Sequence, residues 1–271
     1  MSTTTRTILI ANPSGDVYGS DLQMLQSVAA LRSAGHRVVV ALPVDGPLVP
    51  MLRAAGAEIL SVDFPVLRRA NASLGPFVGL LVGAARALPR LHRAIRRVAP
   101  DVVYVNTVTL PWWLVAGRAA RRPVVCHVHE AETEDRRLVR LALTVPLLLA
   151  DATLVISRST MRVMCEVVPR LERRARLVYN GVPEPDETPS LPASTGAATE
   201  ASPWRVVVVA RLSPRKAPHL ALEAVATLRR EGRDVRLELC GTAFEGYESY
   251  VAELRARSEQ PDLAGAVTFS G

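Results

Sequence analysis

The sequence predicts an α/β fold with two parallel-sheet domains, of which the second is incomplete within these 271 residues. Apolar segments of strand length alternate with amphipathic segments of helical length, a pattern that indicates repeated right-handed crossovers. The alternation is interrupted at residues 183–203, which lack periodicity and are rich in Pro, Ser, Thr, Ala and acidic residues. We interpret this segment as a linker. It separates an N-terminal domain over residues 1–182 from the first part of a second domain over residues 204–271.

The first domain contains a series of short segments typical of parallel strands, because each is rich in apolar or β-branched residues. These segments are Thr7–Ala11, Arg37–Leu42, Glu58–Val62, Asp101–Asn106, Pro123–Val128, Ala152–Ile156 and Arg176–Tyr179. Amphipathic stretches lie between them, among them Asp21–Ala34, Leu48–Ala55, Phe77–Val98 and Trp112–Ala120. Helices between successive strands favour a sheet that is parallel throughout.

The pattern restarts at Trp204. It predicts a strand from Trp204 through Val209. A helix (His219–Arg230), a strand (Val235–Cys240), a second helix (Gly246–Glu259) and a last strand (Ala266–Ser270) follow. The apolar run Val206–Val209 is typical of a strand covered on both faces. Three strands and two helices make a small domain and would leave an apolar edge uncovered, so we expect further chain, or another chain, to complete it.

Composition narrows the class of protein. The three cysteines are far apart and show no CxxC spacing, which favours a reducing cytoplasm and no metal site. The N-terminus lacks the apolar core of a signal peptide, and no apolar run reaches the length of a membrane span. A net charge of +7 raises the question of nucleic acid or an anionic membrane as partner. Only 4% aromatic residues and scattered arginines disfavour nucleic acid.

Ligands of doubly wound sheets bind outside the carboxyl ends of the strands, so residues there are the first candidates for a site. After the first predicted strand comes NPSGDVYGSD, in which Gly15 and Gly19 permit unusual backbone angles and Ser20 or Asp21 can cap the next helix. This segment is not GxGxxG, which disfavours a dehydrogenase. Asn106 closes the fourth predicted strand.

The fifth predicted strand ends in CHVHEAE, which brings His127, His129 and Glu130 to one strand end. The two histidines would share a face if the strand continued through both. A zinc pair is one interpretation, but no third ligand stands nearby. A structural imidazole bonded to a backbone carbonyl is another. We favour a functional role for His129, because it lies further out towards the cleft. Glu130 could orient His129, cap a helix or simply face solvent.

The most informative segment is ARLSPRKAP, which joins the first strand and first helix of the second domain. Arg211, Arg215 and Lys216 follow the strand, and Pro218 suits the first turn of a helix. Lys216 is the only lysine among 33 Lys and Arg residues. Cations beside the unpaired amides of a helix N-terminus suit a phosphate.

Five segments together resemble a known family. They are YGSDLQMLQSVAALRSAGHRVVV, PVVCHVHEAE, LVISRS, LVYNGV and VVVVARLSPRKAPHLALEAVATLRREGRDVRLELCG. In order and spacing they resemble the retaining glycosyltransferases of family 4, whose GT-B fold has two Rossmann-like domains. The resemblance covers nearly all of the chain. It implies transfer of a hexose from a nucleotide-diphosphate sugar to a lipid-linked or saccharide acceptor, with retention of configuration and with neither metal nor cofactor.

The resemblance also implies roles for particular residues. Arg211 and Lys216 resemble the pair that neutralises the donor diphosphate. Gly19 resembles the loop glycine that lets backbone amides approach the donor, with Ser20 beside it. His129 resembles the cleft histidine beside the transferred sugar and joins Arg211 and Lys216 as a catalytic candidate. The acceptor-side candidates are Asp21, Asn106 and Glu130.

Two departures from the family pattern stand out. Ala217 follows the loop lysine where the family usually has glycine. The family also has a pair of glutamates, with seven residues between them, that holds the donor from a Pro- and Gly-flanked segment. Two pairs have this spacing here, Glu223 with Glu231 and Glu245 with Glu253, but they fall in predicted amphipathic helices. We therefore expect the true pair beyond Gly271.

Two alternative functions remain open. The chain could be a truncated, non-catalytic remnant or sugar-binding module of the same fold, inactive by itself. A sugar-nucleotide epimerase would need an acid/base set that the sequence does not offer. The basic amphipathic stretch Phe77–Val98, with Arg86, Arg90, Arg93 and Arg97 at helical spacing, raises the hypothesis of peripheral contact with an anionic membrane at its cytoplasmic face. An ordinary helix that covers the sheet is the alternative.

Overall fold

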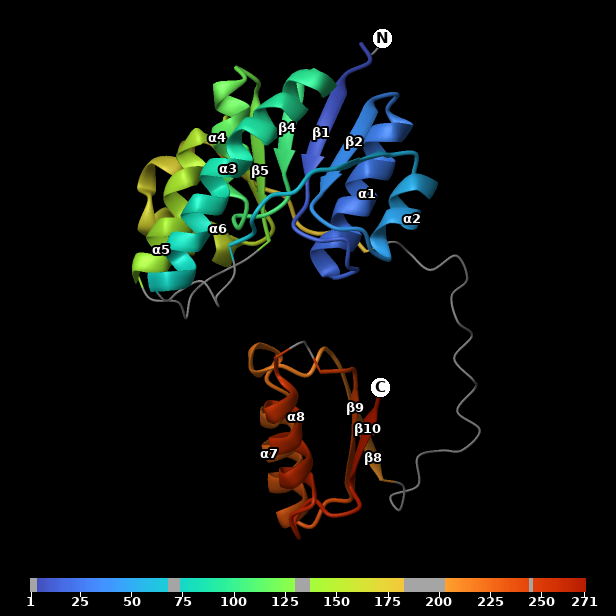
Figure 1. Ribbon diagram of the computed structural model, residues 1–271. Coiled ribbons are helices and arrows are strands. Elements are labelled where there is room, and N and C mark those ends of the chain that lie inside the picture. The colour runs from blue at the N-terminus through green and yellow to red at the C-terminus, as the bar shows by residue number, and fades with distance from the viewer. Residues whose placement is uncertain (1–3, 68–73, 130–136, 183–202, 244–245) are drawn as a thin grey trace. The chain divides into compact units, whose positions relative to one another are not determined.

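The computed structural model describes residues 4–67, 74–129, 137–182, 203–243 and 246–271 (Figure 1). The chain divides into two compact units, residues 1–184 and 185–271. Each unit is a parallel sheet with helices packed on it and has its own hydrophobic core.

The first unit contains a seven-stranded sheet in the order β3-β2-β1-β4-β5-β6-β7, with every neighbouring pair parallel. Its strands are β1 (Thr7–Ala11), β2 (Arg37–Leu42), β3 (Glu58–Ser61), β4 (Val102–Val105), β5 (Val124–Val128), β6 (Ala152–Val155) and β7 (Ala175–Leu177). Its helices are α1 (Gly19–Ser33), α2 (Leu48–Ala54), α3 (Leu74–Val98), α4 (Pro111–Ala119), α5 (Arg137–Thr144) and α6 (Arg158–Val167), with 3₁₀ helices at Val145–Leu149 and Pro169–Arg173.

The alternation of side chains along β1 shows how the sheet is buried on both faces. Ile8 and Ile10 join a core with α1 and α2, whereas Leu9 and Ala11 join a core with α3 and α4. Figure 1 shows α1 and α2 on one side of the sheet and α3 and α4 on the other. Burial on both faces explains why these strands are continuous apolar runs.

The strand order reverses between β1 and β4. From β1 the chain adds β2 and β3 on one side, and β4 then starts the other half of the sheet. In doubly wound sheets this reversal opens a crevice at the carboxyl ends of the two strands. Asn12 directly follows β1 and Asn106 directly follows β4, so the fold brings these two residues to the reversal.

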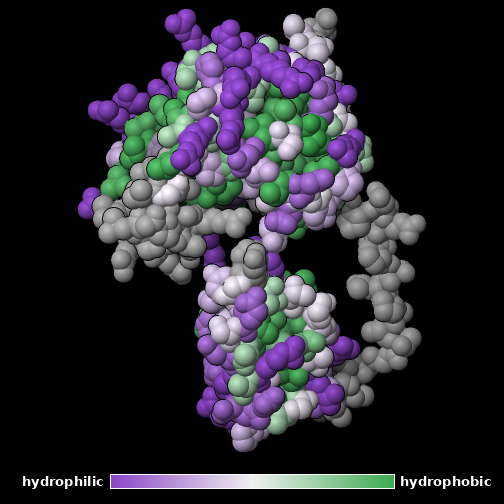
Figure 2. Space-filling model, viewed as in Figure 1, coloured by the Kyte–Doolittle hydropathy of each residue, from purple (hydrophilic) through white to green (hydrophobic). Residues whose placement is uncertain are grey.

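Helix α3 covers the sheet with the second half of its length. Leu91 and Ile95 are fully buried in the core, while Arg90 lies outside and donates to Asp63 over 2.9 Å. Figure 2 shows hydrophilic side chains gathered over the part of the first unit where this half of α3 runs in Figure 1. None of the helices that the structure describes combines the length and apolar character needed to cross a membrane.

The second unit contains a three-stranded parallel sheet in the order β10-β9-β8. Its elements are β8 (Trp204–Val209), α7 (Pro218–Arg230), β9 (Val235–Cys240), α8 (Glu248–Ser258) and β10 (Val267–Ser270), with a 3₁₀ turn at Pro214–Lys216. Figure 1 shows α7 and α8 on the same side of this sheet.

The expectation that β8 is covered on both faces is wrong for the residues that the structure describes. Val206, Val207 and Val209 are exposed, at 37%, 52% and 81%. The reason is that α7 and α8 cover one face alone and β8 pairs with β9 alone. The valine run is thus that of a central strand, but it stands at an edge.

The remaining predicted elements are found within a few residues of their expected ends. Helices α5 and α6 were not predicted from the sequence. Helix α6 begins with a side-chain cap, in which the Ser157 hydroxyl accepts from the Thr160 amide over 3.0 Å. The predicted linker lies almost wholly outside the described residues.

Candidate functional site

A buried polar cluster lies at the carboxyl ends of β1, β4 and β5. Asn106 stands at its centre: its Nδ2 donates to Asn12 Oδ1 over 2.8 Å, and its Oδ1 lies 3.0 Å from His129 Nε2. Asn12 is 0% and Asn106 1% exposed. Amides buried this completely persist because they are hydrogen-bonded.

Asp21 extends the cluster from the first turn of α1. One carboxylate oxygen accepts from Asn12 Nδ2 over 2.8 Å, and the other accepts from the Tyr18 amide over 3.0 Å. The second contact also caps the helix, because it satisfies an amide ahead of its first turn. Asp21 is 2% exposed, so its carboxylate lies behind the surface of the site.

His129 borders this cluster, next to a second buried histidine. His127 is 4% exposed, and its Nδ1 lies 2.6 Å from the Tyr104 hydroxyl. Burial lowers the pKa of His127 from 6.5 to about 4. Burial, followed by the neighbouring His127, lowers the pKa of His129 to about 3. Both imidazoles are therefore neutral at neutral pH, so they offer hydrogen bonds rather than positive charge.

The two glycines of the β1–α1 loop differ in what surrounds them. A Cβ on Gly15 would lie 2.8 Å from the backbone nitrogen of Gly46, so packing within the unit requires glycine there. Gly19, the first residue of α1, has nothing within 4 Å of a Cβ position. Packing among the described residues therefore gives no reason for glycine at position 19. Open space at a helix N-terminus is where an anionic group can approach backbone amides.

The loop after β8 presents its cations outward because one apolar residue fixes it. Leu212 is 3% exposed, belongs to the core of the second unit, and donates its amide to the Thr242 carbonyl over 2.9 Å. Arg211 on one side and Lys216 on the other are exposed. Among the described residues, the Lys216 ammonium makes no ion pair. It is thus available to an anion from solution.

The loop ends in a strained residue. Ala217, the cap of α7, has φ 52° and ψ 40°, the left-handed conformation that favours glycine. Pro218 follows at the first helical position, where the missing amide costs nothing. The departure from glycine at position 217 therefore leaves the turn in place but adds strain.

Gly241, which the sequence analysis did not single out, supports the same loop from β9. It has φ 149°, and a Cβ there would lie 2.0 Å from the Ala210 carbonyl oxygen. Two backbones approach closely at this point, directly before Arg211. The glycine after an apolar strand was the signal that could have identified it.

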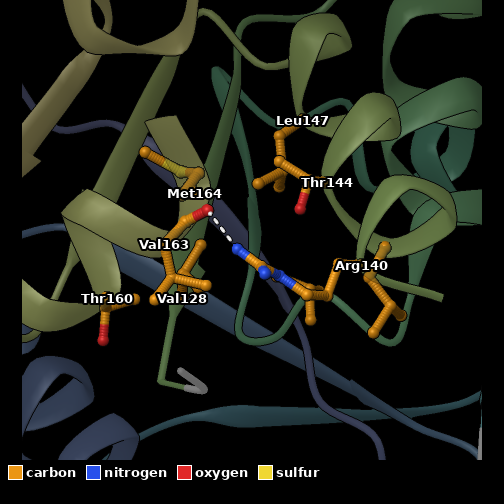
Figure 3. A pocket seen from close by; sticks show the side chains of 9 residues that line it. Val128, Arg140, Thr144, Leu147, Thr160, Val163 and Met164 are labelled. Carbon is orange, nitrogen blue, oxygen red and sulfur yellow. Dashed lines mark hydrogen bonds between the residues drawn. The ribbon is translucent and has the colours of Figure 1, made fainter. Parts of the chain in front are cut away.

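A small cavity is lined by residues of β5, α5, α6 and the 3₁₀ helix at Val145–Leu149. It has a volume of about 30 Å³ and is lined by apolar side chains together with Arg140, Thr144 and Thr160 (Figure 3). Arg140 points into it and donates to the Val163 carbonyl over 3.3 Å. This volume suits a single water molecule rather than a sugar.

The two glutamate pairs noted in the sequence do not form a donor site in the described residues. Glu223 lies on α7, and its carboxylate accepts two hydrogen bonds from Arg257 of α8, at 2.6 and 3.1 Å. Glu245 lies outside the described residues. Where the structure describes the chain, no three His, Cys, Asp or Glu side chains come together as a metal site.

The fold thus brings the candidates together in two groups. In the first unit, Asn106 contacts His129, and its Nδ2 also lies 3.4 Å from the Ser20 carbonyl oxygen, next to Gly19 and Asp21. In the second unit, Arg211 and Lys216 flank one short loop. Glu130 lies outside the described residues. Asn12, which links Asp21 to Asn106, was missed by the sequence analysis.

Glycosyltransferase family models match both units of the chain. The family model of Glycosyltransferase Family 4 matches residues 19–184, and that of Glycosyl transferases group 1 matches residues 197–271. No curated protein matches the sequence.

Several solved structures are similar. Alr3699/HepE of Anabaena, in complex with UDP and glucose, is 24% identical, with a TM-score of 0.71, over 97% of this chain and 68% of its own. A glycosyltransferase from Rickettsia africae is 13% identical, with a TM-score of 0.70, over 99% of this chain and 69% of its own. MurG of Acinetobacter baumannii is 14% identical, with a TM-score of 0.51, over 97% of this chain and 65% of its own.

Proposed function

Because the chain belongs to glycosyltransferase family 4, we propose that it transfers a hexose from a nucleotide-diphosphate sugar to a lipid-linked or saccharide acceptor, with retention of configuration. The predicted GT-B fold class and the assignment as a glycosyltransferase are confirmed. The hexose, the stereochemistry and the acceptor are parts of the proposal, as is the expectation that neither metal nor cofactor takes part.

The observation that carries the proposal is the exposed Arg211–Lys216 loop at the N-terminus of α7. When the bond between sugar and phosphate breaks, negative charge grows on the departing diphosphate. Fixed cations and helix amides that meet this charge stabilise the transition state more than the ground state. Arginine offers a planar fork and lysine a compact charge, so each supplies a different contact. A loop that holds both therefore suits a metal-free transfer.

The first unit supports the sugar-side part of the proposal. His129 is neutral and borders buried amides, so it suits a hydrogen bond to a sugar hydroxyl rather than charge stabilisation. Gly19 leaves open space at the N-terminus of α1 for the donor. Ser20 and Asn106 adjoin this position.

The test is a donor screen with the full-length protein. Hydrolysis and transfer would be measured over a panel of nucleotide sugars, beginning with UDP-glucose because a structure of HepE holds that molecule. We expect one donor to be consumed without added metal and with EDTA present. The anomeric configuration of the product, read by NMR, tests retention. Absence of turnover with every donor would contradict the proposal.

A sugar-binding module without turnover is the second candidate. The observation that favours it is that neither glutamate pair forms a donor site in the part of the chain that the structure describes, where the Glu223 carboxylate is held by Arg257. Nucleotide-sugar binding by the 271-residue chain, with no turnover by the full-length protein, would select this candidate.

We also propose that the protein works at the cytoplasmic face of a membrane through the basic surface of α3. Arg86, Arg93 and Arg97 are exposed, whereas Leu91 and Ile95 on the opposite side are buried in the core. Charge, rather than insertion of an apolar helix face, would thus supply the attraction. Each arginine near an anionic surface contributes about 1 kcal/mol, screened by salt.

Flotation with liposomes tests this contact. We expect the protein to float with anionic vesicles at low salt and to remain unbound with neutral ones. Replacement of Arg86, Arg93 and Arg97 by glutamine should weaken flotation. Equal flotation with neutral vesicles, or none with anionic vesicles at low salt, would contradict the proposed contact.

A further inference from the structure

We propose that Asp21, Asn12 and Asn106 form a directional hydrogen-bond relay that holds His129 in its Nε2–H tautomer. The inference deepens the proposed function, because His129 is the residue expected beside the transferred sugar. Its geometry, however, lies wholly in the first unit and can be tested without any transfer reaction.

The direction of the relay begins at Asp21. Its two carboxylate oxygens accept from Asn12 Nδ2 and from the Tyr18 amide. A carboxylate only accepts, so Asn12 must turn its amide nitrogen towards it. The same nitrogen donates to the Ser14 carbonyl over 2.9 Å, and a carbonyl also only accepts. Two independent acceptors therefore fix which end of the Asn12 amide is nitrogen.

Asn106 inherits its direction from Asn12. With the Asn12 nitrogen committed, Asn12 Oδ1 is an acceptor, and Asn106 Nδ2 donates to it over 2.8 Å. The Asn106 nitrogen also lies 3.4 Å from the Ser20 carbonyl oxygen, a second acceptor on the same side. Asn106 Oδ1 therefore faces His129.

The last step sets the proton on the imidazole. Asn106 Oδ1 lies 3.0 Å from His129 Nε2, and this contact is a hydrogen bond only if Nε2 carries the proton. In a neutral ring the lone pair is then on Nδ1. Since burial keeps the pKa of His129 well below neutrality, one tautomer is selected rather than both nitrogens being protonated.

Burial makes the relay rigid. Asp21, Asn12 and Asn106 are at most 2% exposed, so water cannot replace a partner when an amide turns over. Reversing either amide would place nitrogen against nitrogen or oxygen against oxygen. Asp21, Asn12 and Asn106 are thus positioning residues, which fix the orientation and tautomer of the ring.

The experiment is ¹⁵N NMR of the histidine rings in the labelled 271-residue chain at neutral pH. Long-range proton correlations distinguish a protonated ring nitrogen from one with a lone pair, and loss of a ring in His129→Gln assigns the signals. We expect His129 as Nε2–H, with a ring proton that exchanges slowly with water. A His129 ring protonated on Nδ1, or on both nitrogens, would overturn the inference.

A substitution at the start of the relay tests its direction. In Asp21→Asn, the Tyr18 amide claims the new side-chain oxygen, so the new nitrogen faces Asn12. Position 21 then favours reversed amides, against the Ser14 and Ser20 carbonyls, so His129 should populate the Nδ1–H tautomer beside the Nε2–H form. Asp16→Asn, the same change at an exposed position of the same loop, should leave the tautomer unchanged. An unaltered His129 tautomer in folded Asp21→Asn would contradict the relay.

Activity gives a separate readout. In the full-length enzyme, misorientation of a contact residue should lower kcat of Asp21→Asn by about tenfold or more while KM changes little. The tautomer is measured without substrate. Failure of the proposed function would therefore appear as an inactive parent enzyme that still shows the Nε2–H ring, whereas failure of the relay would appear in the spectrum itself.

Discussion

The imidazole rings of His127 and His129 lie 4.1 Å apart, centroid to centroid, with their planes tilted by 43°. Both rings are in a poorly solvated environment, so protonation of either would place a positive charge against its neighbour without water to screen it. The folded state therefore favours the neutral form of both rings. As the pH falls, protonation of these two histidines should therefore be the first change that destabilises this part of the molecule.

Stability of the first unit should fall below pH 6.5. The folded-state pKa values of His127 and His129, about 4 and about 3, lie below the value of 6.5 expected when the chain is unfolded. The unfolded chain thus binds protons that the folded chain does not. The contribution is fully present above pH 6.5 and is lost progressively towards pH 4, at about 2 kcal/mol for each histidine between pH 7 and pH 5.

Urea unfolding at several pH values, followed by tryptophan fluorescence in a Trp204→Phe background, measures this effect in the first unit alone. The variant His127→Phe should show a smaller loss between pH 7 and pH 5. His219→Gln, an exposed histidine of the second unit, serves as control. Equal pH dependence in His127→Phe and its parent would refute the assignment.

Replacing Ala217 by glycine should stabilise the second unit. The left-handed backbone at this position costs a residue with a Cβ about 1–2 kcal/mol, of which the greater flexibility of unfolded glycine returns a part. We expect a net gain of about 1 kcal/mol, measured by amide hydrogen exchange of α7 and β9. The matched control is Ala224→Gly, in the exposed interior of the same helix, which should cost about 1 kcal/mol. Changes of the same sign in both variants would disprove the strain at position 217.

Loss of the Lys216 ammonium should lower turnover without unfolding the protein. One fixed contact to charge that grows in the transition state is worth a few kcal/mol, so Lys216→Ala should lose about 100-fold in kcat. Lys216→Arg should recover part of this, since it keeps the charge and changes the geometry. Arg233→Ala removes an exposed cation beyond the other end of α7 and should act nearly as the parent enzyme. Activity of Lys216→Ala within about tenfold of the parent would remove this residue from the donor site.

Adding a methyl group at Gly19 should separate function from stability. No described atom lies within 4 Å of the new Cβ, so Gly19→Ala should change the free energy of unfolding by less than about 0.5 kcal/mol. Donor use should fall at least about tenfold, because the methyl group occupies the space through which the donor reaches the α1 amides. Gly79→Ala, at a glycine with equally open surroundings inside α3, is the control for donor kinetics. Unchanged donor kinetics in Gly19→Ala would show that no substrate approaches there.

Much of the fold could be predicted because strand periodicity is a local signal. The apolar runs that became β1 and β2 were identified to the residue, since burial on both faces leaves little freedom in composition. Whether a strand is buried by neighbouring elements, in contrast, cannot be read from its own residues. The valines of β8 resemble those of a central strand, yet their neighbours within the chain decide whether they are buried.

The site was predicted in part for a similar reason. His129 and Lys216 stand out as rare, reactive residues at strand ends. Asn12 does not, because asparagine after a strand is ordinary in turns. Its importance comes from Asn106, 94 positions along the chain, and from the reversal of strand order that brings the two together. The strain at Ala217 likewise could be identified only from its backbone dihedral angles, because the sequence shows no more than the absence of the usual glycine.

The exposed position of Lys216 has a practical consequence for chemical labelling. It carries the only side-chain amine in the sequence, and arginine does not react with amine-selective esters under mild conditions. Above the pKa of the N-terminal amine a reagent meets two amines, whereas a lysine-specific protease meets one bond, that between Lys216 and Ala217. A single cut can therefore be directed to this loop without altering the sequence, and an amine-selective label modifies no side chain other than that of Lys216.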